Sequence, residues 1–294
     1  MISCYAKIDF NKIYRFVMEK YYLAIDLGAS SGRHIIGKNV NGEIVMEEVH
    51  RFKNGVKEEN GHLVWDIDNL YSEIIAGLKI AFSKYPNIES LAIDSWGVDY
   101  ALIKGDETVL PIYAYRDSRT EEPIKIVHEI FSENKLFEKT GIAYQPYNTI
   151  YQLYSDKMMG RLDGVTDFLH IPEYLNFLLT GKKKKEYTMA STTGLVNATT
   201  RQFDSEIISA LGLNKQLFPE LLEGGEIVGD LKEEIQKEVG GNLKVKLCLS
   251  HDTASAFFTA KTLGDENSVY ISSGTWSLLG THESVLHNDV KSKE

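Results

Sequence analysis

The sequence predicts a mixed α/β fold from three observations. Near the N-terminus, apolar strands joined by tight turns are expected at residues 23–27, 34–37 and 43–51. One of these turns is Asn41-Gly42, a pair typical of hairpins, so the three strands should form an antiparallel β-meander. An amphipathic helix is expected at residues 66–84, with apolar side chains recurring on one face. From Gly225 onward strands alternate with helices, which favours a mixed sheet flanked by helices.

The remaining elements follow in order. Asp66 and Asp68 both suit the start of the first helix. Buried strands are expected at residues 90–93 and 100–103, and residues 117–210 should be mostly helical. Loops in that helical part are marked by Gly141, Pro146, Gly164 and Gly181. After Gly225 the expected elements are a strand at 227–228, a helix at 230–239, a strand at 245–249, a helix at 252–263 and a strand at 268–272.

Composition restricts the class of protein. The 294 residues are 43% hydrophobic and 25% charged, values typical of a soluble globular protein. A net charge of −10 argues against nucleic acid as the main partner, although a nucleotide can still be held by backbone N–H groups and a metal ion. We find no uninterrupted apolar stretch of about 18 residues, so no membrane span is predicted. Cys4 and Cys248 suggest no disulfide framework and favour a reducing cytoplasm.

Two lysine-containing segments leave alternatives open. Residues 1–20 differ from the rest and carry charged residues among apolar ones, so they do not read as a signal peptide. Either they form a short helix or arm, or the native start is Met18, directly before the first strand. The lysine run at 182–185 is expected to be a solvated loop, with phosphate docking as the alternative.

The first segment with chemical character is AIDLGASSGR, residues 24–33. We expect Gly28 and Gly32 to adopt positive φ in a tight turn whose small residues leave the backbone uncovered. Such a turn can direct N–H groups, two hydroxyls and Arg33 at phosphate oxygens, and Asp26 could hold a magnesium ion. The alternative is an ordinary hairpin with a small-residue tip.

The second segment is SLAIDSWGVDYALI, residues 90–103, which we interpret as one buried strand interrupted around Gly97. A glycine in a strand indicates a bulge or the close approach of a ligand. Trp96 offers a flat apolar face to sugar C–H groups, or is simply part of the core. Asp94 and Asp99 strengthen the functional interpretation, because acidic residues in a buried strand are unusual.

The third and fourth segments lie towards the C-terminus. In LSHDTASAFFTA, residues 249–260, a strand leads His251 and Asp252 into a helix. An ionised Asp252 at the helix N-terminus could accept a proton from a sugar hydroxyl, or be a plain N-cap. The residues of this helix expected to face inward are Ala256, Phe257 and Ala260. VYISSGTWSLLG, residues 269–280, repeats the strand and small-residue turn of the first segment, as expected where two related halves clamp a triphosphate.

These segments resemble the FGGY carbohydrate kinases, relatives of hexokinase and actin, and among them the members that act on L-rhamnulose. The matching motifs are DLGASSGR at 26–33, DSWGVDY at 94–100, YRDSRT at 115–120, HDTASA at 251–256 and SSGTWSL at 272–278. The resemblance implies an actin/hexokinase-like (ribonuclease H-like) domain with a mixed central sheet. It also implies that residues 1–20 are an extension, 21–262 the first kinase domain and 263–294 the beginning of a second.

The same resemblance implies transfer of the γ-phosphoryl group of ATP to the 1-hydroxyl of L-rhamnulose. Asp252 would be the general base, and Asp26 would position Mg²⁺. The residues that would contact the ketose are Gly97, His251, Asp252 and Thr253. Those that would bind the ATP phosphates are Ala29, Ser30, Ser31, Gly32, Arg33 and Thr275.

The chain ends where the family's second domain continues, so that domain is expected to be largely missing. We therefore expect little or no kinase activity from this chain and an exposed apolar surface. Two alternatives remain: a kinase for another ketose, such as an L-fuculokinase, or a non-catalytic sugar-binding remnant. The expected partners are a ketose and ATP, without nucleic acid or membrane, and the sequence does not predict an oligomeric state.

Overall fold

The computed structural model describes residues 19–262, 268–273, 277–283 and 285–293. The predicted N-terminal extension, the proposed start at Met18 and the candidate Thr275 therefore lie outside the described residues, apart from Glu19 and Lys20. In the described part of the chain, no helix combines the length and the apolar character that crossing a bilayer requires.

A six-stranded mixed sheet forms the centre of the fold, with the strand order β10-β11-β6-β1-β2-β3. Its strands are β1 (Tyr21–Leu27), β2 (Ser31–Val40), β3 (Glu43–Lys53), β6 (Ile88–Ser95), β10 (Ile227–Asp230) and β11 (Lys244–Lys246). The β1–β2 and β2–β3 pairs are antiparallel, whereas β6 runs parallel to both β1 and β11. The predicted β-meander and the mixed sheet are thus confirmed.

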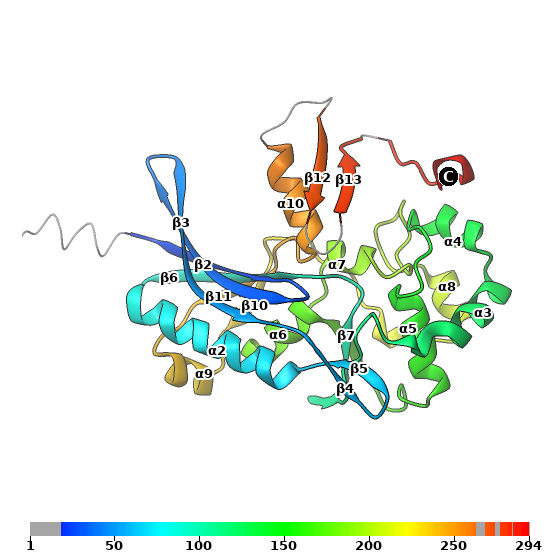
Figure 1. The fold of residues 1–294 in the computed structure, drawn as a ribbon, viewed down its shortest axis with the longest axis horizontal. Helices are drawn as coiled ribbons and strands as arrows, with labels where there is room; N and C mark the ends of the chain where they lie inside the picture. The colour runs from blue at the N-terminus through cyan, green and yellow to red at the C-terminus, as the bar shows by residue number, and fades with distance from the viewer. Residues whose placement is uncertain (1–18, 263–267, 274–276, 284, 294) are drawn as a thin grey trace, which may run out of the picture.

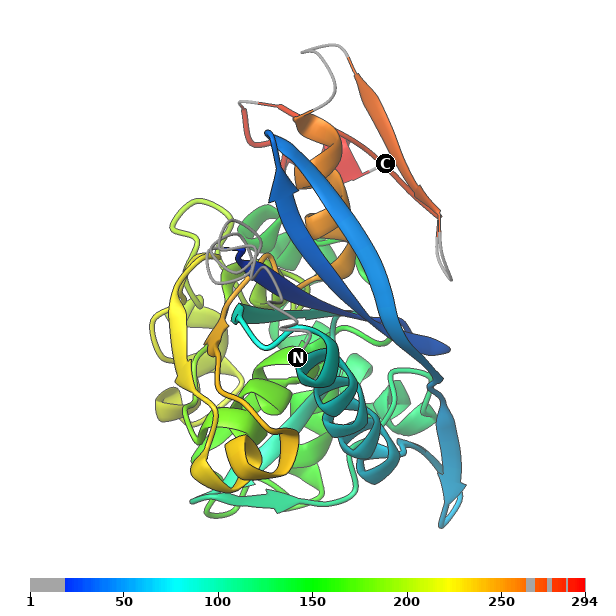
Figure 2. The same cartoon turned by 90° about the vertical axis from the view of Figure 1, so that its left-hand side faces the viewer.

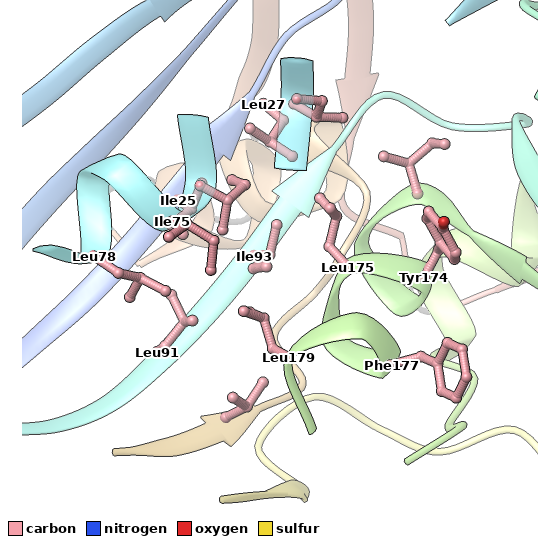
Figure 3. Packing of buried hydrophobic residues seen from close by; sticks show 14 of the residues in the cluster. Ile25, Leu27, Ile75, Leu78, Leu91, Ile93, Tyr174, Leu175, Phe177 and Leu179 are labelled. Atoms are coloured by element: carbon pink, nitrogen blue, oxygen red, sulfur yellow. The ribbon is translucent and has the colours of Figure 1, made fainter. Parts of the chain in front are cut away.

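Helices cover one face of this sheet (Figure 1). They are α2 (Ile67–Lys84), α6 (Ile171–Thr180) and α9 (Glu233–Val239). The predicted helix at 66–84 is therefore confirmed, and Asp66 is its N-cap. Figure 3 shows how this core is filled: the apolar side chains of β1 and β6 pack between those of α2 and α6. Residues labelled in that core include Ile25, Leu27, Ile75, Leu78, Leu91, Ile93, Leu175 and Leu179.

The opposite face of the central sheet is open. Along β1, the side chains of Leu23, Ile25 and Leu27 are buried, whereas the alternate residues Ala24 and Asp26 are partly or fully exposed. Because successive side chains of a strand point to opposite faces, one face of β1 belongs to the core and the other is free to meet a ligand.

A second core lies beside the first, built mainly from helices. Its helices are α3 (Glu121–Ile130), α4 (Glu133–Thr140), α5 (Thr149–Met158), α8 (Ser205–Ala210) and the short 3₁₀ turn η2 (Lys215–Leu217). The 3₁₀ turn η1 (Ser118–Thr120) precedes α3, and α7 (Tyr187–Ser191) belongs to a smaller apolar cluster. A three-stranded sheet accompanies them, made of β7 (Tyr100–Lys104), β8 (Glu107–Val109) and β9 (Asp167–His170). A separate hairpin consists of β4 (Val56–Glu59) and β5 (His62–Trp65).

The C-terminal elements stand on the open side of the central sheet (Figures 1 and 2). They are α10 (Asp252–Lys261) and the hairpin of β12 (Val269–Ser273) and β13 (Ser277–Thr281), whereas the short α11 (Val290–Lys293) lies next to α4. The expectation that α10 faces inward is wrong, because none of its residues is buried and Ala256 is exposed. Phe257 packs on the hairpin instead, with its ring 6.3 Å from that of Tyr270.

Three local predictions are wrong, each because tertiary contacts decide the outcome. β6 and β7 are not one interrupted strand, since the chain leaves the central sheet after Ser95 and enters the smaller sheet at Tyr100. Gly28 and Gly32 do not adopt positive φ. Lys185 is not solvated: it is 2% exposed, and its ammonium group donates to the backbone oxygen of Phe168.

Candidate functional site

A cleft of about 1270 Å³ lies between the open face of the central sheet and the start of α10. It brings together four predicted segments: the turn after β1, the end of β6, the start of α10 and the end of β12. The predicted site residues that line it are Asp26, Ala29, Ser30, Ser31, Arg33, Gly97, His251, Asp252 and Thr253. The cleft therefore joins nearly every candidate residue that the structure describes.

The turn between β1 and β2 is held in a fixed shape by backbone contacts. The N–H group of Gly28 donates to the oxygen of Ser31 at 2.8 Å, and Asn54 closes the turn by donating its side-chain amide to the oxygen of Gly28 at 2.9 Å. Gly32 is the exception among the candidates, because it does not line the cleft. A Cβ at that position would lie 2.2 Å from Cζ of Phe52, so Gly32 is required for packing beneath the turn.

Two carboxylates lie side by side on the open face. Asp26 of β1 and Asp94 of β6 are partners in the parallel register. Asp26 accepts hydrogen bonds from Nε and Nη2 of Arg33, at 2.8 and 2.6 Å. Asp94 has a buried Oδ1 atom with no hydrogen-bond partner among the described residues. Burial, followed by repulsion from Asp26 and Asp252, raises the pKa of Asp94 to about 7.

Asp252 is the first residue of α10 and stands at the mouth of the cleft. The N-cap of this helix is His251, so the alternative that Asp252 is merely an N-cap is wrong. Its side chain is 40% exposed, and its Oδ1 atom lies 3.5 Å from Nε2 of His251. Burial lowers the pKa of His251, while the neighbouring carboxylate raises it. A largely buried imidazole and a partly exposed carboxylate thus lie together at the cleft.

The backbone before Asp252 is fixed to two other elements. Ser95, at the end of β6, forms a parallel bridge with His251, and its N–H group donates to the oxygen of Ser250 at 2.9 Å. On the other side, the buried carboxylate of Glu186 accepts the N–H of Ser250 at 3.1 Å, and the hydroxyl of Thr188 accepts that of His251 at 3.3 Å. Sequence reasoning missed Glu186 and Thr188, because they lie more than 60 residues away from the segment that they hold.

Part of the cleft has an aromatic lining. Trp96 is 7% exposed, and its ring packs on that of Trp65, with centroids 4.2 Å apart. The interpretation of Trp96 as a core residue is therefore confirmed, and because Trp96 also lines the cleft, its use as a ligand platform stays a prediction. Gly97 is in close contact with Thr192, since a Cβ on Gly97 would lie 2.9 Å from its Cγ2 atom. The cleft-lining residues that sequence reasoning did not identify as site residues include Tyr115, Gln145, Tyr147, Asn148 and Thr192.

The left-handed residue at this site is Val98, which adopts a φ of 67°. A β-branched residue in that region is strained, and such strain persists only where the surroundings impose it. The Asp99 N–H group donates to the oxygen of Gly97 at 2.9 Å, and the Thr149 hydroxyl donates to the oxygen of Val98 at 2.7 Å. The bend that the sequence placed at Gly97 is thus centred one residue later.

The mixed central sheet with its flanking helices has the fold of actin/hexokinase-like sugar kinases, as the match to solved structures shows. Xylulose kinase from Rhodospirillum rubrum superposes with a TM-score of 0.80 at 12% identity, covering 92% of this chain and 57% of that one. Plasmodium falciparum glycerol kinase with ADP gives 0.71 at 19% identity, covering 89% and 54%. These likenesses show the fold.

Residues 21–259 match the model of the N-terminal domain of the FGGY family of carbohydrate kinases, and the chain belongs to this family. Similar proteins include the rhamnulokinases of Oceanobacillus iheyensis, 44% identical over 266 residues, and Halalkalibacterium halodurans, 45% identical over 267 residues. Each alignment covers 90% of this chain and 56% of the relative. The chain thus spans about 56% of the length of these curated relatives.

Proposed function

We propose that the cleft binds a ketose and the phosphates of ATP, and that Asp252 accepts a proton from the ketose hydroxyl that is phosphorylated. The observation that carries the proposal is the position of Asp252. Its partly exposed carboxylate lines the same cleft as the Gly28–Ser31 turn, Gly97 and Trp96. A base between a phosphate site and a sugar site is what in-line phosphoryl transfer requires.

The residues present fit a magnesium ion held together with phosphate oxygens. Burial, followed by repulsion from Asp26 and Asp252, raises the pKa of Asp94, and a nearby cation would offset both effects by favouring the charged carboxylate. In the part of the chain that the structure describes, no cluster of three or more acidic, His or Cys side chains forms a complete metal site. We therefore expect Asp26 to hold the ion mainly through water and phosphate. Bound with ATP, Mg²⁺ would neutralise phosphate charge.

The chemistry assigned to this chain's own residues is positioning and proton transfer. The carboxylate of Asp252 takes the hydroxyl proton as the sugar oxygen attacks the γ-phosphorus atom, and the bond from phosphorus to the oxygen of the leaving ADP breaks. The turn residues Ala29, Ser30, Ser31 and Arg33, with Thr275 outside the described residues, would bind the phosphates. His251, Thr253 and Gly97 would contact the sugar.

The proposed sugar is L-rhamnulose, phosphorylated at its 1-hydroxyl. The support is the similarity to proteins named rhamnulokinase, which are 41–45% identical in Oceanobacillus, Halalkalibacterium and Bacillus subtilis. Because this chain spans little more than half the length of those proteins, binding and turnover should be measured separately. Calorimetry with L-rhamnulose, L-fuculose and D-xylulose tests the sugar, and a coupled ADP-release assay tests turnover.

Asp252→Asn tests the assignment of the base. The variant keeps the size of the side chain but cannot accept the hydroxyl proton, so any turnover of this chain should fall by about two to four orders of magnitude. Sugar affinity should change little, because only the proton acceptor is lost. Thermal unfolding provides the control for folding, since the side chain is 40% exposed. Normal ADP release by the folded variant would rule out Asp252 as the base.

A further inference from the structure

Asp99 is a fully buried carboxylate on which hydrogen bonds from four separate segments converge. Its Oδ2 atom accepts from Nε1 of Trp65 at 2.7 Å, Nε1 of Trp96 at 3.0 Å and the backbone N–H of Tyr115 at 3.1 Å. Its Oδ1 atom accepts from Nε2 of Gln152 at 3.2 Å. The carboxylate itself does not line the cleft.

The groups held by Asp99 are the aromatic walls of the cleft. Trp96 and Tyr115 both line it, and the carboxylate accepts from the indole N–H of Trp96 and from the backbone N–H of Tyr115. Gln152 extends the contact to a third wall residue, because its Nε2 group also donates to the backbone oxygen of Tyr147 at 2.9 Å. The rings of Tyr115 and Tyr147 meet edge to face, with centroids 5.6 Å apart. One carboxylate thus connects three cleft-lining aromatic residues.

Stability alone does not explain this arrangement. Burying a carboxylate is costly, and an apolar core of similar volume is often at least as stable. Burial raises the pKa of Asp99 to about 6, against the hydrogen bonds from Trp65, Trp96, Gln152 and Tyr115, which lower it. A charged group that is costly to bury, yet accepts four directed hydrogen bonds, fixes the orientation of its donors.

We propose that Asp99 is a positioning residue for sugar binding, which fixes Trp96, Tyr115 and Tyr147 as a preformed aromatic wall against the C–H face of the ketose. The inference rests on the proposed function of the cleft. Aromatic faces offer sugars an apolar surface next to polar groups. A wall that is already ordered loses less conformational entropy when the ligand binds, so its order contributes to affinity.

The first test is Asp99→Asn, measured by calorimetric titration with L-rhamnulose. The amide keeps one oxygen, but its NH₂ group must face either the cluster of three N–H donors or the NH₂ group of Gln152. We expect sugar affinity to fall about tenfold through misoriented rings. Asp204→Asn is the matched control: Asp204 is 6% exposed, caps α8 and lies outside the cleft. A folded Asp99→Asn variant with the affinity of the Asp204→Asn control would overturn the proposal.

The second test observes the ring itself, by fluorine NMR of protein labelled with 5-fluorotryptophan. Trp96→Phe assigns the resonance, which should be sharp in the unmodified chain and broadened or split in Asp99→Asn. If that variant does not fold, Trp65→Phe serves instead, because it removes one of the hydrogen bonds to Asp99 and alters the ring that packs on Trp96. It should produce the same broadening, with weaker sugar binding. An unchanged Trp96 resonance and unchanged affinity would refute the positioning role.

The two tests separate this inference from the proposed function. Failure of the unmodified chain to bind any of the three ketoses would reject the proposed function. The Trp96 line shape would then still decide whether Asp99 orders the aromatic wall, because that measurement needs no ligand.

Discussion

Asp94 and Asp99 lie five positions apart in one motif, yet their side chains occupy two different environments. Asp94, at the end of β6, points to the open face beside Asp26, whereas Asp99 lies in the core, where two indole N–H groups bind it. The strained bend at Val98 separates the two. Two carboxylates that look equivalent in the sequence therefore differ in role: Asp94 meets the ligand side and Asp99 organises the wall behind it.

Asp94→Asn should remove a pH-dependent cost to folding. The folded-state pKa of Asp94 is about 7, against an ordinary value of 3.8, so the folded protein retains a proton that the unfolded chain has released between these pH values. Stability therefore falls as pH rises through this window. The free energy of unfolding of the variant should equal that of the unmodified chain near pH 4. At pH 8 it should be higher, by up to about 4 kcal/mol.

Urea denaturation at pH 4, 6 and 8 measures this difference. The assignment of the raised pKa to Asp94 would be contradicted if the variant and the unmodified chain differed in free energy of unfolding by the same amount at all three pH values. Added Mg²⁺ provides a further check, because a bound cation should lower the pKa of Asp94 and reduce the advantage of the variant at pH 8.

Sequence motifs predicted the site residues that lie at strand and helix ends. Asp26 and Asp94 each lie one residue before the end of a strand and Asp252 begins a helix, and such positions are recognisable from local patterns. Tyr147, Thr192 and Glu186 carry no comparable local pattern, because they join the site only when the helical part of the chain folds against β6 and α10. Their contribution depends on tertiary packing, which a single sequence does not specify.

At the scale of elements, β2 shows a division between its two faces. Gly32 packs on Phe52 on the core side, while its neighbours Ser31 and Arg33 line the cleft. The sequence suggested that this glycine served backbone flexibility. The structure shows instead that the missing side chain makes room for the ring of Phe52, because the φ of Gly32 is not positive and an added Cβ would collide with that ring.

Gly32→Ala should therefore destabilise the protein through overpacking. The added Cβ would lie 2.2 Å from Cζ of Phe52 and 2.9 Å from Cδ2 of Leu27, and relieving such contacts in a core typically costs about 1–3 kcal/mol. Gly37→Ala in the same strand is the control, since its Cβ would be no closer than 3.8 Å to a neighbour. Thermal unfolding compares the two, and equal melting temperatures would disprove the packing role of Gly32.

The meander and α2 were predictable because local apolar periodicity and turn residues define them. The change of sheet between β6 and β7 was not, since the apolar pattern continues on both sides of the bend. The β4–β5 hairpin was also missed, because β4 is exposed along its length and carries no alternating apolar pattern.

At the scale of the whole molecule, apolar side chains are exposed around the C-terminal elements. Ile271 and Leu279 face each other across the β12–β13 hairpin and are 68% and 73% exposed. Phe258 of α10 is 60% exposed. The predicted exposed apolar surface is therefore present in the described residues, and exposed patches of this kind promote association.

Replacing both Ile271 and Leu279 with Thr should lower the binding of a hydrophobic dye and reduce concentration-dependent association. The melting temperature should stay nearly unchanged, because neither side chain contributes to the core. Ile130→Thr, at an exposed position at the end of α3, is the control for loss of a single apolar side chain. Dye fluorescence and light scattering provide the readouts, and no decrease in either would show that another surface dominates.

The one-sided covering of the central sheet has a consequence for how this chain can vary. In β1, every second residue belongs to the helix-packed core, whereas Ala24 and Asp26, which lie between core residues, line the cleft. A saturation mutagenesis profile of this strand should therefore alternate with a period of two. Substitutions at Leu23, Ile25 and Leu27 should lower the amount of folded protein, whereas substitutions at Asp26 should impair ligand binding. Specificity could thus be redesigned along the strand without disturbing its hydrophobic packing.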